Sequence, residues 1–428
     1  MKFQPPKGTR DFWGDEFYFR QGVINTILSV MERYGFRQAA SPMFESLDLL
    51  VKDAGEEISG QIYRITDKAG RIFGLKSDIT PAMTRIVANQ GKSIMKPIKI
   101  ACSDRVYRYE RPQKGRYREI YQVNAEMFGV KSAASDAELI RCFYDCYREL
   151  GLGEVKILIG YRPLLKLFVA SLVNADLIKP LIRLIDKKDK IGLVEFESEV
   201  KKLRLDGKQI KQLLQYLELS GSPSKIIQLA ETILKNGQFK EYLDNLREIV
   251  GALEDYQVSD KCELNLGVAR GSEYYTGVIF EARYLEQEDK SIGGGGRYDN
   301  LVEFYGGSST PATGFSIGVD RVCELLTMLG KNKNVSPSID YYIASETNSK
   351  TLKITRQLAT KLRAKNKKVE INLTNDYLGE QLMIAKKMGA KKIIILKKDL
   401  LTEKKVKVID VETEKEVTVS QVRGIEIC

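Results

Sequence analysis

Apolar positions recur along the chain with two spacings, one typical of helices and one typical of strands. Residues 16–34 carry apolar side chains at helical spacing and end at Gly35, which predicts a helix. Its predicted buried face consists of Phe17, Ile24, Ile27, Leu28, Met31 and Tyr34. The stretches "PIKIACS", "RVYRYE" and "REIYQVNAEMF" predict strands. Residues 163–256 are rich in Leu, Ile and Lys and poor in Gly, so we expect helices throughout.

Local signals predict where further elements begin. Thr80 and Pro81 predict a helix start, with Thr80 as the N-cap and Pro81 in the first turn. Ser135 and Glu138 have the spacing of a capping box that opens a helix. Its inward residues are predicted to be Leu139, Ile140, Phe143, Tyr144 and Tyr147. The glycine run at 293–296 predicts a turn. Strands are predicted in "CELNLGVARGSEYYTGVIFEARY", and "ATGFSIGVDRVCELL" predicts a strand running into a helix.

These elements predict an α+β fold with three parts. Residues 1–162 and 257–330 form one antiparallel α+β domain, and residues 163–256 form a helical insertion within it. Residues 332–338 read as a linker with a proline. Residues 338–428 alternate strands and helices and end in a hairpin, which predicts an α/β domain with a largely parallel sheet.

Composition narrows the possible chemistry. The 428 residues include no histidine, which excludes Ser-His hydrolases, Cys-His proteases and every histidine general base. The net charge is +11, and from residue 338 onward 19 Lys and Arg against 12 Asp and Glu give +7. This surplus favours an anionic partner. None of the six cysteines form a C-x-x-C pair, so we expect reduced thiols and assign no metal site.

The ends and the hydropathy of the chain suggest a compartment. No apolar run approaches the roughly 20 residues that cross a bilayer. The first residues are polar and lack the apolar core of a signal peptide. We therefore expect a cytoplasmic protein without a membrane partner.

The strand "IYQVNAEMF" alternates polar and apolar side chains. Gln122, Asn124 and Glu126 lie on one face together with Ile120. They belong either to an exposed strand or to the floor of a wet pocket.

The hairpin "RYERPQKGRYR" directs Arg108 and Arg116 toward one cavity, with Glu110 between them. Guanidinium groups match phosphate oxygens, and a carboxylate accepts from the exocyclic amine of a base. The alternative is a charged hairpin with surface ion pairs, which contribute little.

Two further motifs contain glycine at positions that bear on ligand binding. No Gly-Lys-Ser/Thr follows "GGGGRYDNL", so it is not a Walker loop. In "GFSIGVDR", Gly314 and Gly318 bracket a strand, which indicates a close approach to its backbone. Arg321 lies near the start of the following helix, where a cation is unfavourable unless an anion is near.

Together these motifs resemble those of class II aminoacyl-tRNA synthetases of the histidyl type. "GFRQAASPMFES", with Pro42 at the dimer strand, resembles motif 1, "RYERPQKGRYRE" resembles motif 2, and "GFSIGVDR" resembles motif 3. "ARGSEYYTGVIFE" and "GGGGRYDNLVE" are similar to two signatures of the histidyl enzymes, and "PKGTRDF" and "LKSDITPAMTR" also fit. The resemblance spans residues 5–325, and the tail suits the family's anticodon-binding domain.

The resemblance implies a six-stranded antiparallel catalytic sheet, a homodimer, ATP with Mg²⁺, L-histidine and histidine tRNA. It implies catalytic roles for Arg108 and Arg270. The implied ATP-binding residues are Arg108, Glu110, Arg116 and Arg321. The implied histidine-binding residues are Asp78, Thr80, Arg108, Gln122, Glu126, Arg270, Tyr274, Tyr275 and Tyr298.

The chain departs from the usual family pattern at three places. Ser272 and Glu273 replace Leu-Asp, Ile120 replaces an aromatic residue, and Asp78 replaces a longer Glu. Three alternatives remain open: the regulatory subunit of ATP phosphoribosyltransferase, a synthetase-like RNA-binding domain without activity, and another class II synthetase. The regulatory subunit generally lacks the tail domain and the arginine at position 270.

Overall fold

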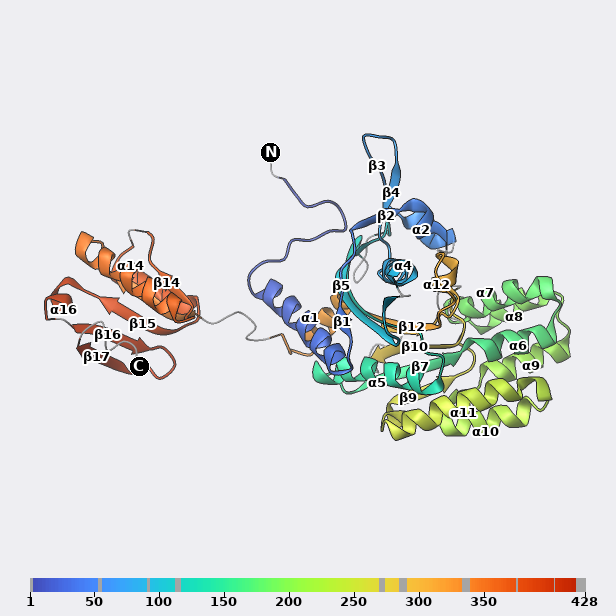
Figure 1. The fold of residues 1–428 in the computed structure, drawn as a ribbon. Coiled ribbons are helices and arrows are strands. Elements are labelled where there is room, and N and C mark those ends of the chain that lie inside the picture. Colours follow the sequence, from blue (N-terminus) through green and yellow to red (C-terminus); the bar gives the residue numbers. More distant parts are fainter. Residues whose placement is uncertain are drawn as a thin grey trace. The chain divides into compact units, whose positions relative to one another are not determined.

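The computed structural model divides the chain into two units, Met1–Asn334 and Val335–Cys428 (Figure 1). It describes residues 3–52, 56–90, 93–111, 117–268, 274–284, 291–332, 339–374, 376–403 and 405–420. The linker predicted at 332–338 lies, apart from residue 332, outside the described residues.

A nine-stranded sheet organises the first unit. Its order is β1 (Arg37–Gln38), β5 (Ile98–Tyr107), β6 (Glu119–Phe128), β12 (Ala312–Gly318), β11 (Ser291–Arg297), β10 (Val278–Tyr284), β7 (Val155–Tyr161), β9 (Cys262–Asn265) and β8 (Ser220–Gly221). The six consecutive strands from β5 to β7 pair antiparallel. This confirms the predicted six-stranded antiparallel sheet and the predicted strands, with "PIKIACS" and "RVYRYE" merging into β5.

Helices α1 (Asp15–Arg33), α5 (Ala133–Glu149) and α13 (Val319–Met328) cover the outer face of this sheet (Figure 1). The apolar stripe predicted for the first helix is buried at Ile24, Ile27, Leu28 and Met31. Phe17 is 46 % exposed, so its predicted burial is wrong. It lies in the first turn of α1, ahead of the part of the helix that is buried.

The predicted helix caps are both shifted. Ser132, rather than Ser135, caps α5 by accepting from the Ser135 N–H, and Ser135 lies buried inside the helix. The five inward residues predicted for this helix are all buried. Thr80 is the first residue of α4 (Thr80–Gln90), and its N–H donates to Asp78 Oδ1 at 3.2 Å. The Thr80 hydroxyl is not a cap, because it donates to another side chain described below.

The glycine run at 293–296 is not the predicted turn but the centre of strand β11. Side chains are excluded here by close neighbours. A methyl group at Gly295 would overlap the Gly314 carbonyl oxygen, and one at Gly293 would overlap the Tyr147 hydroxyl. Glycine therefore permits close packing in the sheet, which outweighs its weak intrinsic strand preference.

Residues 163–256, predicted to be helical throughout, form a helical bundle beside β7 and β9, but the prediction is wrong at Ser220–Gly221, which form the short strand β8 paired with β9 (Figure 1). Its helices are α6 (Arg162–Leu172), α7 (Ala175–Ile191), α8 (Leu193–Lys202), α9 (Gly207–Leu217), α10 (Pro223–Ile233) and α11 (Lys240–Asp255), with short 3₁₀ turns at Gly237–Phe239 and Ser259–Lys261. Their apolar side chains join the same buried cluster as those of the sheet and of α5.

A small antiparallel sheet projects from the first unit (Figure 1). It consists of β2 (Phe44–Ser46), β4 (Ile72–Leu75) and β3 (Arg64–Thr66). The short helices α2 (Leu47–Lys52), α3 (Glu56–Gln61) and α12 (Leu301–Phe304) complete this unit. Helices α4 and α12 contribute to a second apolar cluster on the inner face of the main sheet, against β5 and Tyr298.

The second unit is the predicted α/β domain. Its sheet order is β14 (Val369–Ile371), β13 (Ile339–Ser345), β15 (Ala390–Leu396), β16 (Lys405–Asp410) and β17 (Glu416–Ser420). The first three strands are parallel, and β16 and β17 form the antiparallel hairpin. Its helices are α14 (Ser349–Ala364), α15 (Leu378–Lys387) and α16 (Lys398–Thr402).

The described residues show neither a membrane-spanning helix nor a cluster of metal ligands. Among these residues, no helix has both the length and the apolar character needed to span a bilayer. The five cysteines among them are free and buried, and no group of three or more Cys, Asp or Glu residues there is arranged to hold a metal ion.

Candidate active site

The inner face of the sheet carries the polar side chains of β6. Gln122, Asn124 and Glu126 share this face, whereas Val123 and Ala125 pack into the outer core. Asn124 is fully buried and Glu126 is 1 % exposed. The strand is therefore not the exposed one that the sequence left open, and its polar groups belong to a buried cluster.

Glu126 is the centre of this cluster. Its Oε1 accepts from the Thr80 hydroxyl at 2.6 Å and from the Asn124 amide at 3.2 Å. Its Oε2 accepts a short hydrogen bond from the Tyr298 hydroxyl. Burial raises the pKa of Glu126 from 4.5 to about 7, against the lowering effect of these three donors. A carboxylate held this firmly is prepared to interact with a cationic or N–H-bearing ligand.

Glycines in two neighbouring strands make room for the Glu126 cluster. Gly314 of β12 pairs with Glu126, and a methyl group at this position would overlap Glu126 Oε2. Gly296 of β11 pairs with Gly314, and a methyl group there would lie 3.0 Å from the Tyr275 ring. The sequence predicted a close approach at Gly314, and this approach is that of the Glu126 carboxylate.

Three tyrosines border the Glu126 cluster. The Tyr274 ring meets Tyr275 at 4.8 Å and Tyr298 edge-on at 5.8 Å. Tyr298 is 1 % exposed and belongs to the inner apolar cluster. The three predicted tyrosines therefore lie together beside Glu126.

Arg108 directly follows β5, and its side chain reaches the segment that precedes α4. Its Nε donates to the Ser77 carbonyl at 2.8 Å, and its Nη2 lies 3.7 Å from Asp78 Oδ2. Asp78 in turn accepts from the Thr80 N–H. The structure thus brings Asp78, Thr80 and Arg108 together, and the Thr80 hydroxyl connects this group to Glu126.

Three buried oxygens near Glu126 have no hydrogen-bond partner within the described part of the chain. They are Gln122 Oε1, Asn124 Oδ1 and Ser316 Oγ, and Ser316 pairs with Asn124 across β12 and β6. Buried polar atoms are rarely left unpaired, so they indicate a place for a ligand or water that donates hydrogen bonds. Asn124 and Ser316 were not among the predicted site residues. The signal for Ser316 is its place between Gly314 and Gly318, on the same face as Asn124.

The remaining predicted residues have hydrogen-bond partners other than the Glu126 cluster or lie outside the described residues. Arg321 in the first turn of α13 donates to the Ser291 carbonyl at the start of β11. Glu110 follows β5, and its carbonyl accepts from Arg118 Nε at 3.2 Å. Arg116 and Arg270 lie outside the described residues.

Comparisons with known proteins identify the family. A family model described as histidyl-tRNA synthetase matches residues 8–322, and one described as anticodon binding domain matches residues 341–427. The chain belongs to the histidyl-tRNA synthetase family. It is 37 % identical to the histidine–tRNA ligase of Pyrococcus horikoshii over 97 % of this chain and 96 % of that protein. It is 35 % identical to that of Methanocaldococcus jannaschii over 96 % of both chains.

Solved structures with lower identity support the fold. A crystal structure of histidyl-tRNA synthetase from Nostoc sp. has a TM-score of 0.83 at 24 % identity and covers 100 % of this chain and 99 % of that one. A structure from Bacillus halodurans described as an ATP phosphoribosyltransferase regulatory subunit/histidyl-tRNA synthetase has a TM-score of 0.79 at 23 % identity, over 92 % of this chain and 98 % of that one.

Family membership decides between the alternatives. The curated relatives are histidine–tRNA ligases, so the non-catalytic regulatory subunit is not favoured. The activity of this chain is that of its family, the ligation of histidine to tRNA by an aminoacyl-tRNA synthetase. Enzymes of this class use ATP as a substrate, and the anticodon-binding domain indicates tRNA as a partner.

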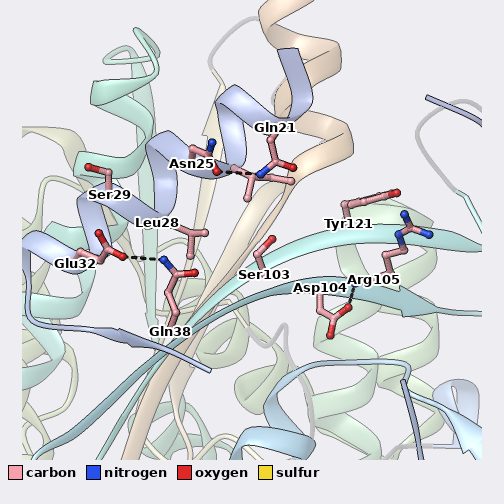
Figure 2. A pocket seen from close by; sticks show the side chains of 11 residues that line it. Gln21, Asn25, Leu28, Ser29, Glu32, Gln38, Ser103, Asp104, Arg105 and Tyr121 are labelled. Carbon is pink, nitrogen blue, oxygen red and sulfur yellow. Dashed lines mark hydrogen bonds between the residues drawn. The ribbon is translucent and has the colours of Figure 1, made fainter. Parts of the chain in front are cut away.

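A separate cavity lies between α1 and the edge of the sheet (Figure 2). Its volume is about 550 Å³, and its lining is mostly polar: Gln21, Ile24, Asn25, Leu28, Ser29, Glu32, Gln38, Ser103, Asp104, Arg105 and Tyr121. Hydrogen bonds join Gln21 to Asn25 and Gln38 to Glu32 along its wall. It includes Gln38 of the motif 1 segment and is separate from the Glu126 cluster.

Proposed function

We propose that the buried cluster around Glu126 selects histidine and that the arginines around it bind ATP. In the first step, an oxygen of the histidine carboxylate attacks the α-phosphorus of ATP. The bond from this phosphorus to the bridging oxygen breaks, and pyrophosphate leaves with the electron pair. In the second step, a ribose hydroxyl oxygen of the tRNA attacks the activated carbonyl carbon, and its proton is released to solvent. The bond from this carbon to the phosphate oxygen breaks, and AMP leaves with the electron pair. Neither step needs an imidazole, because phosphoryl chemistry depends mainly on positioning and charge stabilisation.

The observation that carries this proposal is the buried carboxylate of Glu126. We assign it to the imidazole N–H of histidine, with Tyr274, Tyr275 and Tyr298 around the ring. An amino acid without a hydrogen-bonding side chain would forgo the additional hydrogen bond that this carboxylate, already bound by Thr80, Asn124 and Tyr298, can still accept, and would bind less tightly.

The α-amino group of histidine is assigned to Asp78, Thr80 and Gln122. The Asp78 carboxylate and the unpartnered Gln122 oxygen suit an ammonium group, which has only donors. Arg108, 3.7 Å from Asp78, is assigned to the histidine carboxylate and the α-phosphate. It is one of two proposed catalytic residues, the other being Arg270.

ATP binding is assigned to Arg108, Glu110, Arg116 and Arg321. Glu110 accepts from the adenine amine, and Arg116 and Arg321 bind the outer phosphates. Mg²⁺ enters with ATP, and such ions keep several waters and take one or two protein carboxylates beside the phosphates. Glu281 of β10 shares the inner face with Gly294 and Ser316 and is paired with Arg283, so it would hold the ion only by giving up part of this ion pair. The ion would neutralise phosphate charge.

Three broader assignments complete the proposal. Residues 1–162 with 257–330 form the catalytic domain, 163–256 a helical insertion that contacts tRNA, and 338–428 the anticodon-binding domain. We propose a cytoplasmic homodimer, since the relatives serve translation and motif 1 typically provides the dimer contact. Exposed apolar residues near this segment support a partner chain: Met43 is 52 % and Phe44 52 % exposed.

The decisive experiment is amino-acid-dependent exchange of pyrophosphate into ATP, tested with each of the common amino acids. We expect exchange with histidine alone. Exchange with another amino acid and none with histidine would overturn the assignment of the Glu126 cluster.

Arg270 is tested in the same assay. Arg270→Ala should lower histidine-dependent exchange by ~10²–10³, the range for loss of one preorganised charge-stabilising donor. Because the interaction strengthens in the transition state, kcat should fall more than KM rises. Lysine should restore only part of the rate, since it lacks the planar fork of arginine. An alanine variant with more than about half of the parent's kcat would remove Arg270 from the catalytic residues.

A further inference from the structure

We propose that the N-terminal strap, defined as residues 7–13, is a positioning element of the ATP site and acts through Asp320. This inference rests on the proposed role of Arg321 in ATP binding. It assigns a function to a segment that lies far in sequence from every residue named for the chemistry.

Asp320 connects four parts of the first unit. Its Oδ1 accepts from Arg10 at 2.5 Å and from Arg20 at 2.7 Å, and its Oδ2 accepts from the Tyr121 N–H at 3.0 Å. The side chain of Asp320 is 4 % exposed and that of Arg20 is 7 % exposed. A buried carboxylate with three donors of fixed position has one well-defined orientation.

The contact with Tyr121 extends the sheet into the helix. Pairing between β12 and β6 ends at Gly318 and Gln122, where β12 gives way to α13. The next N–H of β6, that of Tyr121, is bound by the Asp320 side chain instead of by a strand. Asp320 therefore fixes the first turn of α13 against β6, and Arg321 is the next residue in that turn.

The strap supplies the second constraint. The Arg10 guanidinium lies 3.3 Å from the centre of the Tyr117 ring while it donates to Asp320. Phe12 lies under the Arg20 guanidinium at 4.0 Å and meets Tyr121 edge-on at 5.8 Å. The Tyr117 hydroxyl donates to Glu324, which is one turn along α13 from Asp320. The strap thus connects the start of α13 to Tyr117, which lies just before β6.

The same strap also holds the hairpin of Arg108. The Gly8 carbonyl accepts from the Arg118 N–H at 2.8 Å, and the Arg118 carbonyl accepts from the Arg108 N–H at 3.0 Å. Gly8 has φ of +87°, and a methyl group there would lie 2.8 Å from the Arg118 side chain. Only glycine suits this position. One short segment therefore fixes the backbones of two residues assigned to ATP, Arg108 and Arg321, relative to each other.

The first unit contains a matched control cluster. Asp145 of α5 is also a nearly buried carboxylate shared by two arginines, Arg141 at 3.0 Å and Arg148 at 3.2 Å, and it accepts from the Tyr34 hydroxyl at 2.6 Å. It contacts none of the residues assigned to histidine or ATP. A loss caused only by disturbing a buried ion cluster should therefore appear in Asp145→Asn as well.

The test measures KM for ATP, KM for histidine and kcat in pyrophosphate exchange for Arg321→Ala, Arg10→Ala, Arg10→Lys, Asp320→Asn and Asp145→Asn. We expect Arg10→Ala and Asp320→Asn to raise the KM for ATP by about fivefold to tenfold. Their KM for histidine should rise less than their KM for ATP, because Arg108, which is assigned to both substrates, contacts the strap only through Arg118. Arg10→Lys should lie between Arg10→Ala and the parent, because lysine keeps the charge but not the fork. The double variant Arg10→Ala/Asp320→Asn should have a KM for ATP no higher than that of Asp320→Asn alone, since both residues act through one contact.

Each other result counts against one part of the argument. If Arg321→Ala leaves the KM for ATP unchanged, the proposed ATP role of Arg321 is wrong and the strap inference falls with it. If Arg321→Ala raises this KM while Arg10→Ala does not, the strap inference alone is wrong. An equal rise in both KM values, or an equal effect of Asp145→Asn, would show a general structural loss and overturn the inference. Arg10 is 30 % exposed, so its variants should fold even if Asp320→Asn does not.

Discussion

Glu126 is the residue on which histidine selection should depend. A buried carboxylate that accepts from an imidazole N–H makes a charge-assisted hydrogen bond of roughly 1.5–3 kcal/mol. Glu126→Gln should therefore raise the KM for histidine by about tenfold or more in pyrophosphate exchange. Glu138→Gln is the control, because Glu138 pairs with Lys99 away from the cluster. An unchanged KM would remove Glu126 from the histidine site.

The raised pKa of Glu126 also predicts a dependence of stability on pH. The folded protein holds this proton up to about pH 7, whereas an unfolded glutamate releases it near 4.5. The folded state thus binds more protons between these values, and its stability falls as pH rises through the window and is constant above it. Glutamine cannot titrate. The unfolding free energy of the parent should therefore fall relative to Glu126→Gln by about 3 kcal/mol across this window.

Urea unfolding of both proteins at several pH values measures this difference. The Glu126→Gln curve removes the contribution of all other titrating groups, because these are common to both proteins. Two curves that stay parallel from pH 4.5 to pH 7.5 would contradict the burial-induced pKa shift.

At the scale of elements, strand β12 needs a glycine at position 314, because a side chain there would overlap the Glu126 carboxylate. Gly314→Ala would place a methyl group on Glu126 Oε2 and displace a carboxylate held by three donors. We expect the KM for histidine to rise at least as much as in Glu126→Gln, about tenfold or more. The KM for ATP should change less, since Arg108 and Arg321 approach from other elements.

The control for this change is the same substitution at a glycine elsewhere in the first unit that has free space around it. Gly251 lies inside α11, and an added methyl group would meet no atom within 4 Å. Gly251→Ala should leave both KM values unchanged and stabilise the helix by roughly 0.5–1 kcal/mol. Equal kinetics for the Gly314 and Gly251 variants would show that Glu126 tolerates displacement.

The glycines also show which features of the fold cannot be predicted from the sequence. The strands, the helical stretch and the α/β tail follow from periodicity, because each apolar pattern matches the face that the fold buries. The local composition of residues 293–296 predicts a turn, because the approach of Phe315 and Tyr147 from distant segments leaves no local signal in the sequence. The cap at Ser132 was missed for a related reason. Ser135 has the capping-box spacing, but burial places it within the helix.

The candidate site likewise contains some residues that the sequence predicts and others that only the structure reveals. Alternation placed Gln122 and Glu126 on one face, and the family motifs supplied Asp78, Thr80 and the three tyrosines. The unpartnered oxygens of Asn124 and Ser316 depend on the register between β6 and β12, which is a long-range property. The proposed role of Asp320 rests on its contacts with Arg10 and Arg20, which lie about 300 positions away in the sequence. Local sequence spacing does not predict such contacts.

At the scale of the whole molecule, the helical bundle shares a buried core with the main sheet of the first unit, whereas the tail has apolar clusters of its own. Helices α6 to α11 share one buried apolar cluster with the sheet and α5, so removal of residues 163–256 would expose the core of the first unit. Their proposed contact with tRNA is better tested by charge reversal at exposed lysines. Lys208→Glu with Lys211→Glu on α9 should lower tRNA charging and leave pyrophosphate exchange unchanged. Equal losses in both reactions would favour a purely structural role.

The tail can be removed more cleanly, because residues 335–428 form a compact unit with their own apolar clusters. A chain that ends at Gly330 loses the domain that carries +7 of the net charge of +11. The residues proposed to bind histidine and ATP all lie in the first unit, so pyrophosphate exchange should persist. Charging of tRNA should fall sharply, and its dependence on salt should weaken, because each lost phosphate contact lowers the salt slope by about 0.9. The measurement is aminoacylation at a series of salt concentrations, with full-length protein as the control and light scattering to show that the oligomeric state is unchanged. Equal charging by both proteins, with equal salt slopes, would mean that the tail does not carry the tRNA affinity.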